Sequence, residues 1–305
     1  MVRSTLAGAA AKKSNTSVFM KILMNHFQLI LLVSSFNFQW PDQLQTFFSA
    51  TSPVSSASTQ VISIDCFMAA KASFASGSDS YFQTYYLKLG IFALLPVLLG
   101  LISYTVWGLQ ACLKKIQFNP GKAIATLVIS LFTVHPNIVQ TMFDDFNCQD
   151  VDGTSVVYKD MTIKCWSPPY TFWSLFIALP SIVVWGLGIP FFAFILMFRE
   201  RKTLDQISTK EKFGFLYAGY QSKFYYWEIL IMYRKIAMIF ISVFITPYGV
   251  IVQAMIVFLL MILFLILTLK KKPYMSISLN ELEAISLVTS TVSIYCGIFF
   301  ITSVN

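Results

Sequence analysis

Three charged residues stand close together inside an apolar stretch of the chain. Glu228, Arg234 and Lys235 lie in YYWEILIMYRKIAMIFISV, which covers residues 225–243. A charge at the centre of a hydrocarbon layer costs about 2.5–3.5 kcal/mol on insertion scales, so such residues usually find partners and often mark a functional site. Two kinds of chemistry fit them: an ion-pair network that holds helices together, and a gating or ion-translocation site.

A later apolar stretch supplies candidate partners for these charges. Glu281 and Glu283 stand where that stretch begins. This stretch enters the membrane from the same face as the stretch that carries Arg234 and Lys235. Snorkelling along the helix is the alternative, but Lys235 lies about ten residues, or roughly 14 Å of helix rise, beyond Tyr226. We therefore expect Arg234 or Lys235 to pair with Glu281 or Glu283, and a structural role is favoured over gating.

A second polar group lies in the middle of another apolar stretch. His135, Pro136 and Asn137 are consecutive, and Pro136 frees a backbone carbonyl one turn earlier that His135, Asn137 or a water could occupy. Such a polar kink is more typical of helix packing than of a proton or ion site. Asp144 and Asp145 follow; they could gather cations at a pore mouth, although solvated loop acids are the commoner case.

The sequence carries no recognisable pattern for catalysis or metal binding. It has no nucleophile–base constellation, phosphate-binding loop or HExxH motif. There are two histidines, and the five cysteines fit no zinc spacing. We expect no enzyme activity, no metal site and no cofactor. Nucleic acid is not an expected partner, because the basic residues are not interleaved with a readable nucleic-acid motif.

Composition identifies the environment in which these groups are placed. The chain of 305 residues is 56% hydrophobic and only 12% charged, against about 25% charged in soluble domains. Apolar runs of about 20 residues recur, and each can cross a hydrocarbon core of about 30 Å as a helix. The sequence predicts an all-α polytopic membrane protein, with the lipid bilayer as its surroundings and other membrane or extracellular proteins as further partners.

We predict seven transmembrane helices within a domain over residues 18–305. The first run could instead be a signal peptide, but it is long and lacks an A-x-A cleavage site. Asn25, His26 and Gln28 in this run are expected to form hydrogen bonds across helices. In the fourth run, Pro180 and Pro190 predict kinks. The predicted spans are about 18–38, 85–111, 123–143, 171–198, 226–245, 250–269 and 279–302, after a flexible cytoplasmic tail over 1–17.

The distribution of lysine and arginine predicts the orientation. The positive-inside rule places the N-terminus in the cytoplasm and the C-terminus outside or in a lumen. The expected location is a plasma membrane, a ciliary membrane or an endomembrane. This orientation argues against a rhodopsin-like receptor, whose N-terminus lies outside. The residues on the basic side are Arg3, Lys12, Lys13, Lys21, Lys114, Lys115, Lys122, Arg199, Arg201, Lys202, Lys210, Lys212, Lys223 and Lys270 to Lys272.

A polar segment on the opposite side predicts a small extracellular β-hairpin. Two runs with strand-like alternation flank Asp152-Gly153, and Cys148 and Cys165 bracket them. We expect these cysteines to form a disulfide, which persists in an oxidising compartment. Cys66, Cys112 and Cys296 receive no assigned role.

Three blocks carry a resemblance to a known group of proteins. They are KILMNHFQLI…FNFQWP…SIDCF, FGFLYAGYQSKFYYWEILIMYRK and KKKPYMSISLNELEAISLVTSTVSIYCGIFF, which lie within residues 21–67, 213–235 and 270–300. Together they resemble the C-terminal membrane module of large protist membrane proteins, found in ciliates, oomycetes and algae. The first two blocks also resemble the fungal TRP-like family, which is related to polycystins.

The resemblance implies a TRP-like protein that transports cations or senses a mechanical or chemical stimulus. One departure from a TRP pore is the turn Thr246-Pro247-Tyr248-Gly249, which is too short to hold a pore helix and filter. The alternative function is a non-conducting structural membrane subunit that anchors an extracellular or membrane assembly.

Overall fold

The computed structural model describes residues 15–36, 38–55, 83–204 and 206–302. Cys66 and almost all of the predicted tail over 1–17 lie outside these ranges. Most of the described residues are helical. The regular helices are α2 (Asn15–Ser34), α3 (Asp42–Ser55), α6 (Thr84–Lys114), α7 (Pro120–Asp144), α11 (Ile207–Tyr217), α12 (Trp227–Phe244), α13 (Val250–Lys271) and α14 (Ile277–Thr302).

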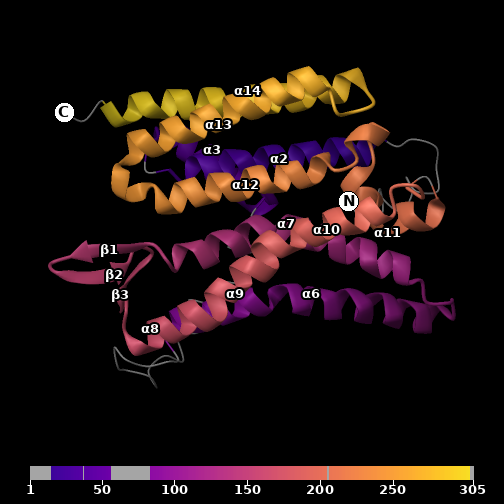
Figure 1. The fold of residues 1–305 in the computed structure, drawn as a ribbon, viewed down its shortest axis with the longest axis horizontal. Helices are drawn as coiled ribbons and strands as arrows, with labels where there is room; N and C mark the ends of the chain where they lie inside the picture. Colours follow the sequence, from indigo (N-terminus) through magenta and orange to yellow (C-terminus); the bar gives the residue numbers. More distant parts are fainter. Residues whose placement is uncertain (1–14, 37, 56–82, 205, 303–305) are drawn as a thin grey trace.

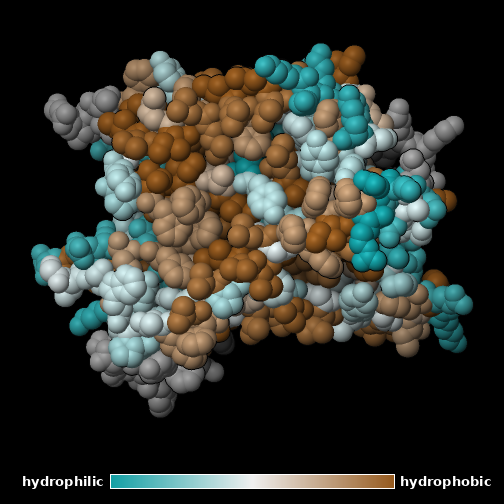
Figure 2. Space-filling view, viewed as in Figure 1, coloured by the Kyte–Doolittle hydropathy of each residue, from teal (hydrophilic) through white to brown (hydrophobic). Residues whose placement is uncertain are grey.

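Six helical segments of the described ranges are long and apolar enough to cross a membrane. They are α2, α6, α7, a composite run over Pro168–Arg199, α13 and α14. Apolar side chains cover the middle of the molecule in Figure 2, and hydrophilic side chains gather at its two ends. These features are consistent with an integral membrane protein. The remaining predicted span, over 226–245, corresponds to α12, whose 18 residues include Glu228, Arg234 and Lys235.

Helix α12 lies in the interior of the bundle. It packs against α2, α7, α10 (Gly188–Arg199), α11 and α13, and twelve of its 18 residues are buried. By contrast, only 22% of the apolar window of α6, of the composite run and of α13 is buried. The long helices run roughly side by side, with the small sheet at one end and α11 and the α13–α14 turn at the other (Figure 1). The charged helix is therefore central, and the most apolar helices are peripheral.

A large apolar cluster fills the half of the bundle nearer the sheet. Its buried members come from α2, α7, α12, α13 and α14, and include Leu29, Val33, Ile239, Val257 and Leu287, none of which is exposed by more than 1%. The Phe38 ring packs directly on the backbone of Gly297, where a Cβ atom would lie only 2.5 Å from the ring. This half of the bundle is consequently apolar and tightly packed.

The polar segment after α7 forms a three-stranded antiparallel sheet. Strands β1 (Cys148–Val151), β2 (Thr154–Val157) and β3 (Asp160–Lys164) pair in chain order, and the Cys148–Cys165 disulfide is confirmed. The expected turn at Asp152-Gly153 joins β1 to β2, with positive φ at both residues. The predicted two-stranded hairpin is wrong in its strand count, because the second run breaks into two strands at Tyr158-Lys159.

The composite run departs from regular helix where the sequence predicts kinks. Pro180 and Pro190 have no N–H, so the carbonyls four residues earlier lack a helical donor. Two π-helical segments precede these prolines. The elements are α8 (Pro168–Trp173), η2 (Ser174–Ala178), α9 (Leu179–Ser181), η3 (Ile182–Leu187) and α10 (Gly188–Arg199).

Two connections meet at the end of the bundle opposite the sheet. After α11 the chain forms the short helix η4 (Ser222–Phe224). The N–H of Gln221, the residue before η4, donates to the Pro273 carbonyl at 2.8 Å. The Met275 N–H donates in turn to the Gly219 carbonyl at 2.9 Å. This pairing joins the α11–α12 connection to the α13–α14 turn. At the sheet end, α12 and α13 are joined only by Ile245, η5 (Thr246–Tyr248) and Gly249.

Candidate functional site

Five charged side chains are buried together between α2, α12 and α14. They are Lys21 on α2, Glu228, Arg234 and Lys235 on α12, and Glu283 on α14, and none is exposed by more than 1%. The sequence pointed to four of them. Lys21 entered the sequence analysis only as an orientation charge, and Glu281 is exposed and stands outside this group.

Lys21 and Glu228 form the best-aligned ion pair of the group. Lys21 Nζ lies 2.8 Å from Glu228 Oε2 and donates to the Phe215 carbonyl at 3.1 Å. Nζ also lies 4.4 Å from the centre of the Tyr220 ring, and such a cation–π contact gains strength when it is shielded from water. The pair thus ties α2 to α12 and to the end of α11.

Two tyrosines link the Lys21–Glu228 ion pair to the α11–α12 connection and the α13–α14 turn. The Tyr220 hydroxyl donates to Glu228 Oε2 at 2.8 Å, and it lies 3.2 Å from the Tyr274 hydroxyl. Burial raises the pKa of both phenols well above the usual value of 10.0, so they stay neutral and can donate to a carboxylate. Nothing in the sequence placed these two residues beside each other.

Lys235 has amide partners and does not reach either predicted glutamate. Its Nζ donates to Asn25 Oδ1 at 2.6 Å and to Gln28 Oε1 at 2.5 Å, and it lies 4.4 Å from the centre of the Phe132 ring. The Gln28 amide donates onward to the Thr133 carbonyl at 3.2 Å. The cross-helix hydrogen bonds expected for the first span are therefore present.

His26 adds one more contact between helices. Its Nδ1 lies 3.0 Å from the hydroxyl of Ser286 on α14, so all three polar residues predicted to act across helices have such a partner.

Arg234 is the basic residue that reaches Glu283. One guanidinium nitrogen, Nη1, lies 3.5 Å from Glu283 Oε1, longer than the 2.7–2.9 Å of a well-formed charged hydrogen bond. The guanidinium also faces the Phe264 ring at 5.4 Å. Arg234 Nε and Nη2 and Glu283 Oε2 are buried without a hydrogen-bond partner. Adjacent helical residues point about 100° apart, which explains why Arg234 faces α14 while Lys235 faces α2.

At the predicted kink in α7, His135 contacts another helical segment instead of a carbonyl of α7 itself. His135 is buried, and its Nε2 lies 3.0 Å from the Gly186 carbonyl, the group that loses its helical donor because of Pro190. The expectation that His135 or Asn137 would occupy the carbonyl freed by Pro136 is therefore not what the structure shows. Asn137 Nδ2 is buried without a partner, and Pro136 is buried within α7.

The two acids at the end of this helix, Asp144 and Asp145, also depart from expectation. Asp144 is half-buried and Asp145 is completely buried, so neither is a solvated loop acid. Within the described ranges, no group of three or more His, Cys, Asp or Glu side chains could hold a metal ion. The arrangement can therefore link helices through charge and can hold or move a proton at a carboxyl, an amine or a phenol.

Known proteins offer one informative similarity. No family model and no solved structure matches the chain. The chain is similar to the cysteine repeat modular protein A of Toxoplasma gondii. The two are 23% identical over an alignment 311 residues long, which includes 79% of this chain and 10% of the Toxoplasma protein. The chain thus corresponds to a short part of that much longer relative.

Proposed function

We propose that this chain is a seven-span membrane module that anchors a larger protein or assembly and conducts no ions by itself. The observation that carries the proposal is the division of the bundle into two halves. Buried charges with side-chain partners occupy the half near α11, while a packed apolar cluster fills the half near the sheet. A buried charge cluster that is followed by a packed apolar core favours an anchor over a pore.

In this proposal, α12 is a span in addition to the six apolar helical segments. Its 18 residues rise about 27 Å, close to the thickness of a hydrocarbon core. Its three charges would oppose insertion alone, but α2 and α14 supply partners for all of them. Seven spans with the basic residues of α10, α11 and the α13–α14 turn at one end favour a cytoplasmic location for that end.

The anchoring role rests on the opposite end. The disulfide-closed sheet would then face an oxidising compartment, where such a bond persists. The similarity to a far longer protein whose name describes cysteine repeats supports an arrangement in which this kind of module holds a large extracellular part. The same similarity is compatible with the protist membrane module that the sequence blocks resemble.

A second candidate is TRP-like cation transport or sensing. It is favoured by the buried, incompletely paired Arg234 and Glu283, because incompletely satisfied polar networks are plausible moving elements. It is opposed by the Thr246–Tyr248 turn, which leaves no room for a filter between α12 and α13. In this second case α12 and the α11–α12 connection would act as a cytoplasmic lever.

Electrical recording from the purified chain in liposomes separates the two candidates. We expect no current above that of empty liposomes under voltage, membrane tension or Ca²⁺. A reproducible cation current that is altered by Glu283→Gln, and not by Glu281→Gln at an exposed position, would overturn the anchor proposal and favour transport.

A further inference from the structure

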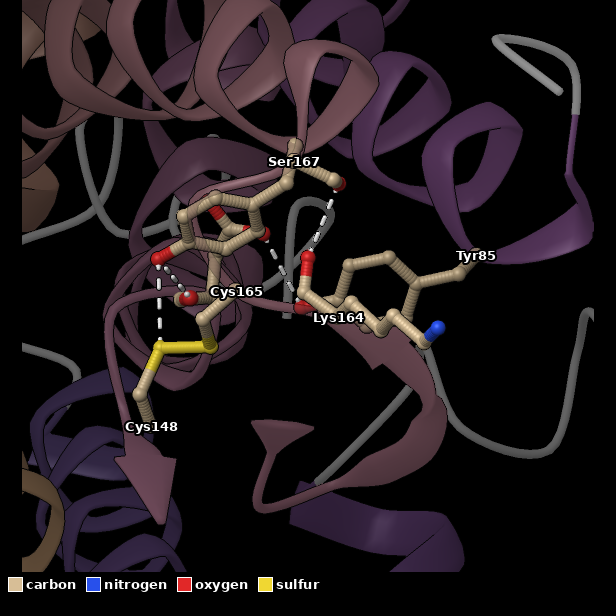
Figure 3. Close-up of a disulfide and its surroundings, with 7 residues drawn as sticks. Tyr85, Cys148, Lys164, Cys165 and Ser167 are labelled. Atoms are coloured by element: carbon tan, nitrogen blue, oxygen red, sulfur yellow. Dashed lines mark hydrogen bonds between the residues drawn. A yellow bond between two sulfur atoms is a disulfide. The ribbon is translucent and has the colours of Figure 1, made fainter. Parts of the chain in front are cut away.

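Asp145 is a buried carboxyl on the opposite side of the molecule from the charge cluster. It follows the last residue of α7 and is 0% exposed. Tyr85 at the start of α6, Tyr170 in α8 and the disulfide-closed sheet meet around it. Figure 3 shows how the Cys148–Cys165 bond, Tyr85 and Ser167 converge on this corner.

The contacts of Asp145 fix its position but leave part of the carboxyl without a partner. The Tyr85 hydroxyl donates to Oδ1 at 3.1 Å, and the Tyr170 hydroxyl donates to the backbone carbonyl at 3.1 Å. The Ser174 hydroxyl faces the same carboxyl. However, neither Asp145 Oδ2 nor Ser174 Oγ completes an aligned hydrogen bond. Two buried oxygen atoms, Asp145 Oδ2 and Ser174 Oγ, are therefore left without an aligned hydrogen bond.

The surrounding charges do not compensate a carboxylate at this place. From α6 the facing groups are Tyr85 and Tyr86, from α8 Tyr170, and from α7 Asp144. On the sheet side, Lys159 acts on Asp144 and Asp160 acts on Tyr86. Burial raises the pKa of Asp145, and the hydroxyls of Ser174 and Tyr85, which face the carboxyl, only partly oppose this rise. An isolated carboxylate in such surroundings is costly.

We propose that the Asp145 carboxyl is a proton-binding site that controls how firmly α6 and the disulfide-closed sheet are held on α7. A proton needs no cavity. Placed on Oδ2, it can be donated to Ser174 Oγ, which gives both oxygens a partner. Loss of this proton leaves a buried negative charge beside Tyr170, whose hydroxyl also lies 3.5 Å from Cys148 Sγ. The corner then loosens, and the disulfide becomes easier to reach.

The direction of the pH effect follows from linkage. Folding raises the pKa of this carboxyl above its usual value of 3.8, so the folded state holds the proton more tightly than the unfolded state. The stability of the corner is therefore greatest below pH 3.8 and falls as the pH rises through the raised pKa. Each unit of raised pKa corresponds to about a tenfold change in the opening equilibrium.

Infrared difference spectra of the purified protein test the site directly. We expect a carbonyl band of a protonated carboxyl that titrates above pH 3.8 in the wild type and is absent in Asp145→Asn. Asp152→Asn is the matched control, because Asp152 is exposed in the β1–β2 turn and Asn tolerates its positive φ. Ser174→Ala should keep the band and shift its frequency. A titrating band of wild-type size in Asp145→Asn would overturn the proposal.

Reduction of the disulfide by a membrane-impermeant phosphine reports the consequence. With Cys66, Cys112 and Cys296 replaced by Ser, the reduction rate should rise with pH in the wild type and in Asp152→Asn, by about tenfold for each unit of raised pKa. It should be slow and flat in Asp145→Asn. Equal pH dependence in Asp145→Asn and the wild type would contradict the coupling between the proton and the sheet.

Discussion

Replacement of Lys21 by Met should destabilise the bundle strongly. Lys21→Met keeps most of the apolar stem but removes the 2.8 Å ion pair with Glu228, the hydrogen bond to the Phe215 carbonyl and the contact with the Tyr220 ring. Removing one partner of a buried pair costs about 3–5 kcal/mol, since it leaves an uncompensated charge. Glu228 keeps the bonds from Tyr220 and Asn25, so we expect a loss near 3 kcal/mol, more than a hundredfold in the unfolding equilibrium.

The free energy of unfolding in mixed micelles with increasing SDS, followed by circular dichroism, measures this loss. Glu228→Gln keeps an acceptor for Tyr220 but removes the charge, so the double variant Lys21→Met/Glu228→Gln should recover at least about 1 kcal/mol relative to the sum of the singles. Lys114→Met, at an exposed position at the end of α6, serves as the control and should stay within about 0.5 kcal/mol of wild type. A Lys21→Met protein as stable as this control, or strict additivity in the double variant, would refute the reasoning.

Two further predictions concern other contacts of α14. Arg234→Met should cost about 3–5 kcal/mol, whereas Arg234→Met/Glu283→Met should be close to wild type, because a buried pair replaced by apolar side chains is often neutral; a double variant less stable than both singles in the same assay would contradict this. Gly297→Ala should cost about 1–3 kcal/mol by overpacking, because its Cβ would lie 2.5 Å from the Phe38 ring. Gly108→Ala, whose Cβ meets nothing within 4 Å, should raise the thermal midpoint slightly; similar shifts for both glycines would count against the close packing of α14.

Apolar periodicity and length were enough to predict most of the helical architecture. The predicted spans at 85–111 and 250–269 correspond to α6 and α13 within a few residues, because a helix in lipid needs a long continuous apolar run. The disulfide also followed from two cysteines that bracket a polar segment. The break between β2 and β3 did not, since a reversal at Tyr158-Lys159 carries no glycine or proline signal.

The charged residues could be found in the sequence, but their partners could not. Lys21 stands near the start of a span, where a lysine usually reaches headgroups, and its partner Glu228 lies more than 200 residues away in the chain. Tyr220 and Tyr274 meet only because two connections pair at one end of the bundle. The choice between Arg234 and Lys235 for Glu283 depends on the rotation of α12 about its axis. Rotation and pairing of helices are tertiary properties that periodicity alone leaves open.

Sidedness of the two ends of α12 tests the seven-span proposal most directly. Single cysteines are introduced at Lys223, before α12, and at Tyr248, after it, and both positions are exposed. Membranes of known orientation are then labelled with a membrane-impermeant maleimide, in a chain whose three cysteines outside the disulfide, Cys66, Cys112 and Cys296, are replaced by Ser. We expect the two positions to be labelled from opposite sides of the membrane. Labelling of both from the same side would show that α12 does not cross, and would contradict the assignment of its buried charges to a transmembrane helix.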